Sequence, residues 1–534
     1  MKHETLHLAD YIIIAIALAV SLTIGLRFSK GQNSTKKYFV SRGSLPAWAI
    51  GMSLMATLIS SVTFLAYPGE GFSSNWILLV QGLMVPIILL LMVWFIVPLY
   101  REVIGVSTYE YFEKRFGAFA RFYSSISFVL THFSKMGTVF FLLALALANM
   151  TNTNTYAIIW IIGFVIIIIT LIGGIEAVIW ADVVQGFLLI GGGIVSFIIL
   201  ICSIRGGFPE LWHIATINHK NNFGPYSWDF KKLTFIVMAI NGVFYAIQKY
   251  GTDQTMVQRY LTAKTDKAAI RASIMGVALT VPLWALFMFI GTALFAFYQQ
   301  NPLPAGIKAD AVFPYFIMSK LPTGVVGLIL AALISAAISS LGADLNCLSA
   351  IGVEDYYKKL RPNRTDQEYL KAGRWIVVAA GLGSILIATL YLLAGDEGVL
   401  GIVFTLYAIF SGGIAGIFLL GLFSSRANRQ GLNIGITACI IFTAYAFLTS
   451  TKIGLGNNKH ILLDLGPYNF NQHKYMLGVY SHLVVLVVGY TASLFFPKPE
   501  LNKNLLFSGW LATKRAQKLK KYINEDKVIN ITDL

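Results

Sequence analysis

Hydrophobic residues along this chain are gathered into long, nearly uncharged blocks that alternate with short polar connections. Runs of about 18 or more apolar residues are typical of helices that span a membrane. Inside hydrocarbon the backbone must satisfy its own hydrogen bonds, so each of these runs is predicted to be helical. The pattern therefore predicts an all-α membrane protein.

The blocks predict about thirteen transmembrane helices. Their expected ranges are 9–27, 46–66, 75–100, 121–149, 156–173, 177–204, 233–250, 272–299, 323–353, 374–394, 398–424, 431–450 and 475–497. A polar, basic tail follows the last helix, and we expect it to be solvated and to touch anionic lipid.

Lysine and arginine lie mostly on one side of this predicted topology. If the connections alternate between two sides, 29 of the 41 basic residues fall in one set, which includes Arg259 after helix 233–250. Cytoplasmic connections carry the excess of basic residues in membrane proteins. The asymmetry predicts an N-terminus outside and a C-terminus in the cytoplasm. It also explains most of the net charge of +16 without a nucleic-acid partner.

Composition agrees with a membrane protein, because 56% of the residues are hydrophobic and only 12% are charged. Cys202, Cys347 and Cys439 lie in apolar runs and are expected to be small helix residues, not a disulfide framework. The apolar run 11–26 has no small-residue cleavage site after it, and basic residues follow it. It is therefore predicted to be a retained first helix.

The second helix and the turn after it combine hydroxyl side chains with helix-breaking residues. Pro68 and Gly69 lie in this turn. Proline removes a backbone donor and clashes with the preceding turn, so the helix is expected to be interrupted or to end early there. Transporters use broken helices to bind ions and substrate, whereas the alternative is a plain proline kink. The hydroxyl residues are Ser53, Thr57, Ser60, Ser61 and Thr63.

Helix 323–353 carries a second group of polar positions. Ala336, Ser339 and Ser340 are spaced i, i+3, i+4 and therefore share one face. Two hydroxyls and a carbonyl on one face can ligate a small cation. Serine also packs membrane helices together, so the spacing alone leaves both interpretations open.

Two ionisable residues fall inside otherwise apolar helices, where such residues are unfavourable and often functional. Asp182 must be protonated, paired or close to a bound cation. Lys135 lies near the middle of its helix, too deep to reach the interface, and needs a carboxylate, carbonyls or an anionic substrate. His132 is expected to be a hydrogen-bonded structural residue.

The sequence shows no Cys/His metal cluster, phosphate-binding loop or nucleophile triad. An enzyme and an ATP-driven pump are therefore disfavoured. An ion gradient is the expected driving force.

Four stretches together resemble the sodium/solute symporter family, which includes the sodium–glucose symporters. They are AVIWADVVQ at 177–185, GTDQTMVQRY at 251–260, AALISAAISS at 331–340 and LGLF at 420–423. The resemblance covers about residues 8–500. It implies a LeuT-type fold, in which two inverted five-helix repeats form the transport core.

The resemblance also implies how the chain is organised. Residues 1–45 would hold an extracytoplasmic N-terminus, a leading helix and a cytoplasmic loop. Residues 46–424 would form the ten-helix core, and residues 425–497 two peripheral helices. Residues 498–534 would be the basic cytoplasmic tail.

The family's shared sodium site is built from carbonyls of the broken helix and residues of the ninth helix. Mapped onto this chain by resemblance, it comprises Ala56, Ile59, Ala336, Ser339 and Ser340.

Some members have a second sodium site, made of an aspartate and three serines. Asp182 and Ser339 match this second site, but Gly342 and Ala343 stand where two of its serines would be.

Within the family, the chain is most similar to the bacterial sialic acid symporters. Ser60 and Thr63 match positions that hold the substrate carboxylate in those proteins. Lys135 replaces a carboxylate-binding arginine, keeping the charge but losing the bidentate fork. Gln81 lies beside Gly82, which replaces a pocket glutamine, and is included in the predicted substrate site.

The expected function is sodium-coupled import of a small organic solute, best matched by sialic acid or another acidic sugar or carboxylate. One alternative is symport of a neutral sugar or polyol, with Lys135 paired to a protein group. Another is a non-concentrative membrane sensor or channel. Sodium would be the coupling ion without a further cofactor. The expected partners are the substrate and the lipid bilayer of the plasma membrane, which is the inner membrane in a bacterium.

Overall fold

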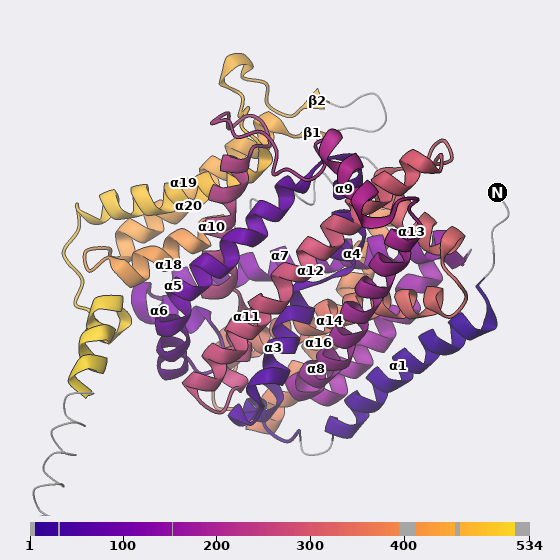
Figure 1. The fold of residues 1–534 in the computed structure, drawn as a ribbon. Coiled ribbons are helices and arrows are strands. Elements are labelled where there is room, and N and C mark those ends of the chain that lie inside the picture. The colour runs from indigo at the N-terminus through magenta and orange to yellow at the C-terminus, as the bar shows by residue number, and fades with distance from the viewer. Residues whose placement is uncertain (1–5, 30–31, 152, 395–411, 454–459, 518–534) are drawn as a thin grey trace, which may run out of the picture.

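The computed structural model describes residues 6–29, 32–151, 153–394, 412–453 and 460–517, most of which are helical (Figure 1). One short antiparallel hairpin pairs β1 (Lys452–Ile453) with β2 (His460–Ile461). The first part of predicted helix 398–424 and the end of the predicted tail lie outside the described residues.

The helices of the first part of the chain include one long bent element. They are α1 (Leu8–Ser29), α2 (Thr35–Val40), α3 (Ala47–Leu58), α4 (Ser61–Ser73), α5 (Leu79–Val103), α6 (Tyr109–Phe116), α7 (Ala118–Thr151), α8 (Thr155–Cys202) and α9 (Gly207–Ile217). Short 3₁₀ turns cover Ser41–Gly43 and Trp76–Leu78.

The second part of the chain contains the most deeply buried span. Its helices are α10 (Phe235–Gly251), α11 (Gln254–Thr262), α12 (Asp266–Gln300), α13 (Ala309–Lys320), α14 (Val325–Ile351), α15 (Lys358–Leu360), α16 (Asp366–Ala394), α18 (Ile414–Phe423), α19 (Arg429–Ser450) and α20 (Lys474–Ser493). A π-helix, Gly352–Tyr357, joins α14 to α15. Two 3₁₀ turns cover Gly466–Tyr468 and Lys503–Leu505.

Nine helices of the described residues are long and apolar enough to cross a membrane, and the bent pair α3–α4 would make a tenth. The helix α10 has only 17 residues, and the described part of α18 only 10. Two predicted spans, 156–173 and 177–204, are joined in α8, so the total of thirteen stays a prediction.

The long helix α8 explains that difference. It has 48 residues, about 72 Å at 1.5 Å per residue, more than twice the thickness of a membrane core. At Gly174 its backbone leaves the helical region, with φ 58° and ψ −158°. The helix therefore bends between the two predicted spans without an intervening loop.

Replacing Gly174 with alanine is expected to destabilise the protein strongly. Its backbone conformation is essentially restricted to glycine, and a Cβ atom would lie 2.8 Å from the Tyr38 carbonyl oxygen. We expect the free energy of unfolding to fall by about 1–3 kcal/mol or more. Thermal unfolding of the purified protein would measure this loss. Gly191→Ala is the control, because nothing lies within 4 Å of that Cβ position.

The core of the bundle is organised around α14. In the most apolar stretch of the span that α14 begins, 89% of the residues are buried, whereas the corresponding share is 12% for α1 at the edge of the bundle. The helices α8, α7, α16 and α3 pack against α14, and α12 packs against α3 and α4. The helices α18, α19 and α20 form a separate group at one side (Figure 1). A broken helix is thus enclosed by α8, α12 and α14.

The sequence predicted that the second span is interrupted near Pro68, but the break lies elsewhere. The helix α3 ends at Leu58, α4 begins at Ser61, and the two are bent by 57°. Pro68 instead lies inside α4, where a Cβ on Gly291 of α12 would approach its carbonyl oxygen to 2.2 Å. Gly291 therefore allows the backbones of α4 and α12 to touch.

Candidate functional site

The break between α3 and α4 exposes backbone groups in the middle of the bundle. Ile59 and Ser60 have extended backbone, with φ/ψ of −93°/106° and −111°/178°. The last carbonyls of a helix have no partner within it, so those from Ala56 to Ile59 are available for other contacts. Ala56 and Ile59 are fully buried. These are the two residues of the broken helix that were predicted to ligate sodium.

Helix α14 meets α3 at this break. The Ser340 hydroxyl donates a hydrogen bond to the Thr57 carbonyl oxygen, 3.3 Å away, in the last turn of α3. Ala336, Ser339 and Ser340 are all buried. The structure thus brings the serine face of α14 to the break in α3–α4.

Asp182 on α8 completes this group from the other side. Its Oδ1 atom accepts a hydrogen bond of 2.6 Å from the Ser339 hydroxyl, and Ser53 donates to Oδ2. The Arg259 guanidinium lies 3.0 Å from the same Oδ2 atom. The side chains of Asp182 and Arg259 are 1% and 0% exposed, so this is a buried ion pair.

Arg259 had been counted among the surface charges of the connection between helices 233–250 and 272–299, but in the structure its side chain is buried. It lies on α11, a short helix folded back into the bundle, and is the largest fully buried side chain in the described residues. Its guanidinium also donates to Ser53 Oγ (2.8 Å), Thr57 Oγ1 (2.6 Å) and the Thr255 carbonyl (2.7 Å). The guanidinium thereby links α11 to the broken helix.

Lys135 on α7 has a carboxylate partner. Its Nζ atom lies 3.0 Å from Asp344 Oδ2 and 3.1 Å from Oδ1, and Asp344 is fully buried on α14. The Lys135 side chain is 25% exposed. An ammonium group has three donors, so this lysine can donate to a further oxygen atom while Asp344 stays bound. His132, one turn away, is hydrogen-bonded as predicted.

The other predicted substrate residues lie on three elements. Ser60 is in the break, Thr63 is in the first turn of α4, and both are buried. Gln81, on α5, accepts a hydrogen bond of 3.1 Å from Asn241 of α10.

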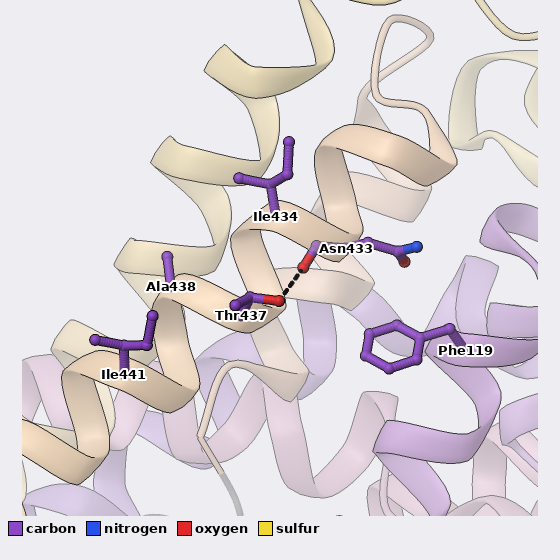
Figure 2. A pocket seen from close by; sticks show the side chains of 6 residues that line it. All are labelled: Phe119, Asn433, Ile434, Thr437, Ala438 and Ile441. Carbon is purple, nitrogen blue, oxygen red and sulfur yellow. Dashed lines mark hydrogen bonds between the residues drawn. The ribbon is translucent and has the colours of Figure 1, made fainter.

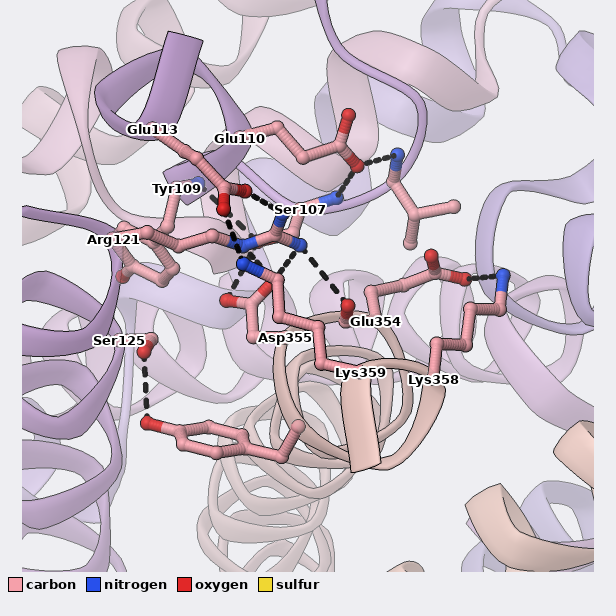
Figure 3. Close-up of polar contacts among 12 residues, drawn as sticks. Ser107, Tyr109, Glu110, Glu113, Arg121, Ser125, Glu354, Asp355, Lys358 and Lys359 are labelled. Carbon is pink, nitrogen blue, oxygen red and sulfur yellow. Dashed lines mark hydrogen bonds and ion pairs between the residues drawn. The ribbon is translucent and has the colours of Figure 1, made fainter. Parts of the chain in front are cut away.

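A further ion-pair network lies where α14 runs into the π-helix (Figure 3). Arg121, near the start of α7, donates to Asp355 (2.9 Å from Nε to Oδ1) and to Glu113 on α6. Lys359 donates to the other oxygen of Glu113. Burial raises the pKa of Glu113, but the bonds from Lys359 and Arg121 outweigh burial and hold that pKa below its ordinary value. The network ties the ends of α6, α7 and α14 together.

A groove of about 400 Å³ lies on the outer surface between α7 and α19 (Figure 2). Its lining is mostly apolar and contains none of the predicted site residues, so it is a groove that lipid would cover. It is lined by Phe119, Asn433, Ile434, Thr437, Ala438 and Ile441.

A much smaller cavity, about 10 Å³, lies beside Asp182 and has room for about one water molecule. Thr170 Oγ1 and Gln185 Oε1 are buried without a hydrogen-bond partner, and both residues line this cavity. Gly342, which contributes no oxygen, lines it as well.

The buried polar groups therefore form two sets with different chemistry. The first set offers carbonyl and hydroxyl oxygens at a broken helix, which suits a small hard cation. The second set offers a partly exposed ammonium group, which suits an anion. Sequence reasoning found Asp182 and Lys135 but missed Arg259. The signal was the lone carboxylate itself, because a buried Asp182 required a cation that an arginine could supply.

Comparison with known proteins identifies the family of this chain. The family model described as sodium:solute symporter family matches residues 38–438. The sodium/sialic acid symporter NanT of Aliivibrio fischeri is 32% identical over 509 residues, covering 94% of this chain and 96% of the relative. The sodium/sialic acid symporter SiaT of Proteus mirabilis is 33% identical, covering 92% and 96%.

Solved structures agree with these relatives. A substrate-bound, outward-open sodium-coupled sialic acid symporter superposes with a TM-score of 0.84 at 31% identity, covering 92% of this chain and 99% of that one. Mhp1, a nucleobase-cation-symport-1 transporter, superposes with a TM-score of 0.59 at 16% identity, which shows a shared fold alone. The predicted LeuT-type fold is therefore confirmed. The chain belongs to the sodium:solute symporter family, whose members are sodium-coupled membrane transporters and not enzymes.

Proposed function

We propose that this protein imports sialic acid, or a closely related acidic sugar or carboxylate, together with sodium. The names of its relatives support the substrate class. The observation that carries the proposal is Lys135, an ammonium group inside the bundle that is partly exposed and has donors beyond its bond to Asp344. With a neutral sugar, this charge would serve only as the partner of Asp344, and its remaining donors would have no anion to bind. Lys135 is the group that distinguishes an acidic substrate from a neutral one.

Sodium would bind at the break between α3 and α4. The ligands would be the backbone oxygens of Ala56, Ile59 and Ala336 and the hydroxyls of Ser339 and Ser340. Two contacts support this set: Ser340 reaches the Thr57 carbonyl, and Ser339 reaches Asp182. A bound sodium would fix the angle between the two half-helices. Since Ser60 and Thr63 follow the break directly, sodium would thereby order the pocket that receives the substrate.

The substrate carboxylate would bind Ser60, Thr63 and Lys135, and Gln81 would contact a polar group elsewhere on the solute. Ser60 has extended backbone at the N-terminus of α4, where backbone N–H groups and the helix dipole favour an anion. Lys135 would supply the full positive charge. Three elements would therefore converge on one carboxylate.

One sodium per cycle is the expected stoichiometry. Asp182, the carboxylate of the possible second sodium site with Ser339, already has Arg259 as its cation. Gly342 supplies no hydroxyl there. A monoanion carried with one sodium moves no net charge, so the membrane potential would not contribute to its accumulation. With a second sodium, each 100 mV would contribute about 2.3 kcal/mol.

The direction of transport follows from the proposed topology. The excess of lysine and arginine in one set of connections places the N-terminus outside and the C-terminus in the cytoplasm. Because the related symporters come from bacteria, we place the protein in the bacterial inner membrane.

The proposal is tested by uptake of labelled sialic acid into liposomes containing the purified protein. We expect accumulation only with an inward sodium gradient, competition by acidic sugars, and no response to an imposed membrane potential. Ser340→Ala is expected to raise the half-saturating sodium concentration about tenfold, because it removes one of the proposed sodium ligands. We take the loss to be similar to that of one hydrogen bond to a charged group. Ser196→Ala is the control, because that buried serine bonds only within α8.

Other outcomes identify the alternatives. If neutral sugars compete and acids do not, the protein is a sodium/neutral sugar symporter. If solute equilibrates without accumulating, the fold serves a channel or a sensor.

A further inference from the structure

Five ionisable side chains form a continuous chain inside the bundle. It runs from Lys135 to Asp344, then to His132, Asp253 and Lys249. His132 Nδ1 lies 2.8 Å from Asp344 Oδ1, and His132 Nε2 lies 3.3 Å from Asp253 Oδ2. Lys249 Nζ lies 2.8 Å from the same Asp253 oxygen. The chain connects α7, α14, the residue that caps α11, and α10.

The middle of this chain places one histidine between two carboxylates. Both ring nitrogens of His132 face carboxylate oxygens. An ionised carboxylate only accepts hydrogen bonds, so the imidazolium form of the ring, with a proton on each nitrogen, can donate to both aspartates at once, whereas the neutral ring can donate to only one. The Phe128 ring stacks on it with centroids 3.8 Å apart, which holds the plane of the ring in place. His132 is 3% exposed, so this charge is buried.

The protonation state decides the charge balance of the chain. With His132 protonated, three cations (Lys135, His132 and Lys249) meet two carboxylates, so within the described residues of this chain one positive charge is uncompensated. With His132 neutral, two cations meet two carboxylates and the balance is complete. A buried, uncompensated charge is unfavourable until an ion of opposite sign joins it.

Side-chain exposure indicates at which end of this chain an anion could bind. Lys135, at one end of the chain, is 25% exposed, whereas Lys249, at the other, is 13% exposed and bonded to both Asp253 and Thr255. Among the described residues, the other titratable side chains near the two aspartates are Tyr109, Tyr245, Tyr260 and Cys347, which are neutral around pH 7. The surplus positive charge is therefore available at Lys135.

We propose that His132 determines the anion selectivity of this transporter. Its protonated ring holds Asp344 and leaves the Lys135 ammonium to complete its charge with the substrate carboxylate. When His132 loses its proton, Asp344 becomes the sole counter-ion of Lys135, and the chain has no surplus charge to attract a monoanion. His132 is thus a positioning residue that acts through Asp344. This inference rests on the proposed function, in which Lys135 binds the substrate.

The expected consequence is an anion affinity that weakens as pH rises. Sodium-dependent uptake should be measured over about pH 5 to 8, the range in which histidine ordinarily titrates. In the wild type we expect KM to rise at least tenfold across this range, with a smaller change in maximal rate. His132→Gln should show a high KM that is independent of pH. His213→Gln is the matched control, because that histidine is exposed on α9.

A measurement on the unmodified protein keeps the test valid if His132→Gln does not fold. In weakly buffered solution, substrate binding to the wild type should take up protons at the upper end of the pH range. Three results would each overturn the inference. They are a wild-type KM that does not change with pH, a KM of His132→Gln that changes with pH as the wild type does, and substrate binding without proton uptake. Wild-type anion uptake that depends on sodium but not on pH leaves the proposed function standing. Uptake of neutral sugars alone refutes both.

Discussion

Replacing Arg259 with glutamine is expected to lower the free energy of unfolding by about 3–5 kcal/mol. The substitution leaves Asp182 as a buried carboxylate without its cation, while Ser53 and Thr57 lose a charged donor. An isolated buried charge is far less stable than a paired one. The loss should appear as a large drop in melting temperature and in the yield of monodisperse protein.

Two further variants separate pairing from general damage. Arg361→Gln removes an exposed arginine and should leave the melting temperature unchanged. Arg259→Met combined with Asp182→Leu removes both charges and should recover much of the stability, since an apolar pair can replace a buried ion pair. If Arg259→Gln has the same melting temperature as the wild type, the ion pair contributes nothing to the free energy of unfolding and Asp182 is neutral. If the double variant retains its sodium dependence, Asp182 ligates no sodium.

The second large effect is expected at Lys135. Lys135→Ala removes the proposed anion contact and also leaves Asp344 buried without its lysine. A hydrogen bond to a charged group contributes about 1.5–3 kcal/mol, so substrate affinity should fall about 10-fold to 100-fold. Sodium-dependent uptake at low substrate concentration measures this change.

Companion variants identify the cause of the loss. Lys135→Arg keeps the charge and adds a bidentate fork, so it should retain anion transport. Lys371→Ala, at an exposed position, should behave as the wild type. If Lys135→Ala keeps the wild-type KM and loses only stability, Lys135 is a structural partner of Asp344. The substrate carboxylate would then bind elsewhere.

The sequence predicts those parts of the structure that depend on neighbouring residues in the chain. It does not predict those that depend on contacts between distant residues. Apolar runs are local, and they placed α1, α5, α7, α14, α19 and α20 close to their observed bounds, whereas α12 and α16 begin earlier than predicted. The bend of α8 at Gly174 falls between two predicted spans because glycine marks it locally. The break at Ile59–Ser60 has no proline or glycine, so local propensity pointed to Pro68 instead. Contacts with α14 and α11 hold this break, and these contacts are visible only in three dimensions.

Buried charges show the same division. Asp182 and Lys135 stood out because a single charge in an apolar run is a local signal. Their partners lie 77 and 209 residues away, and no local pattern indicates which cation or carboxylate they meet. Arg259 was the harder case, since the short polar helix α11 resembles a connection on composition alone. The sodium ligands and the substrate residues remain predictions, which the arrangement of α3, α8 and α14 supports.

The ion pairs along α7 and α14 have a mechanical consequence. One tie joins Lys135 and His132 to Asp344, and the other joins Arg121 to Asp355. At about 1.5 Å per residue, the two ties are separated by about 16 Å along α14 and the π-helix that continues it, and by about 21 Å along α7. Two helices fastened at two heights resist rolling, sliding and splaying, and so act as a single strut. We expect α3, α4 and the closely packed α12 to turn against this strut at the bend Ile59–Ser60 as access alternates between the two faces of the membrane, with the contacts of the bend to α14 and α11 broken and remade in each cycle.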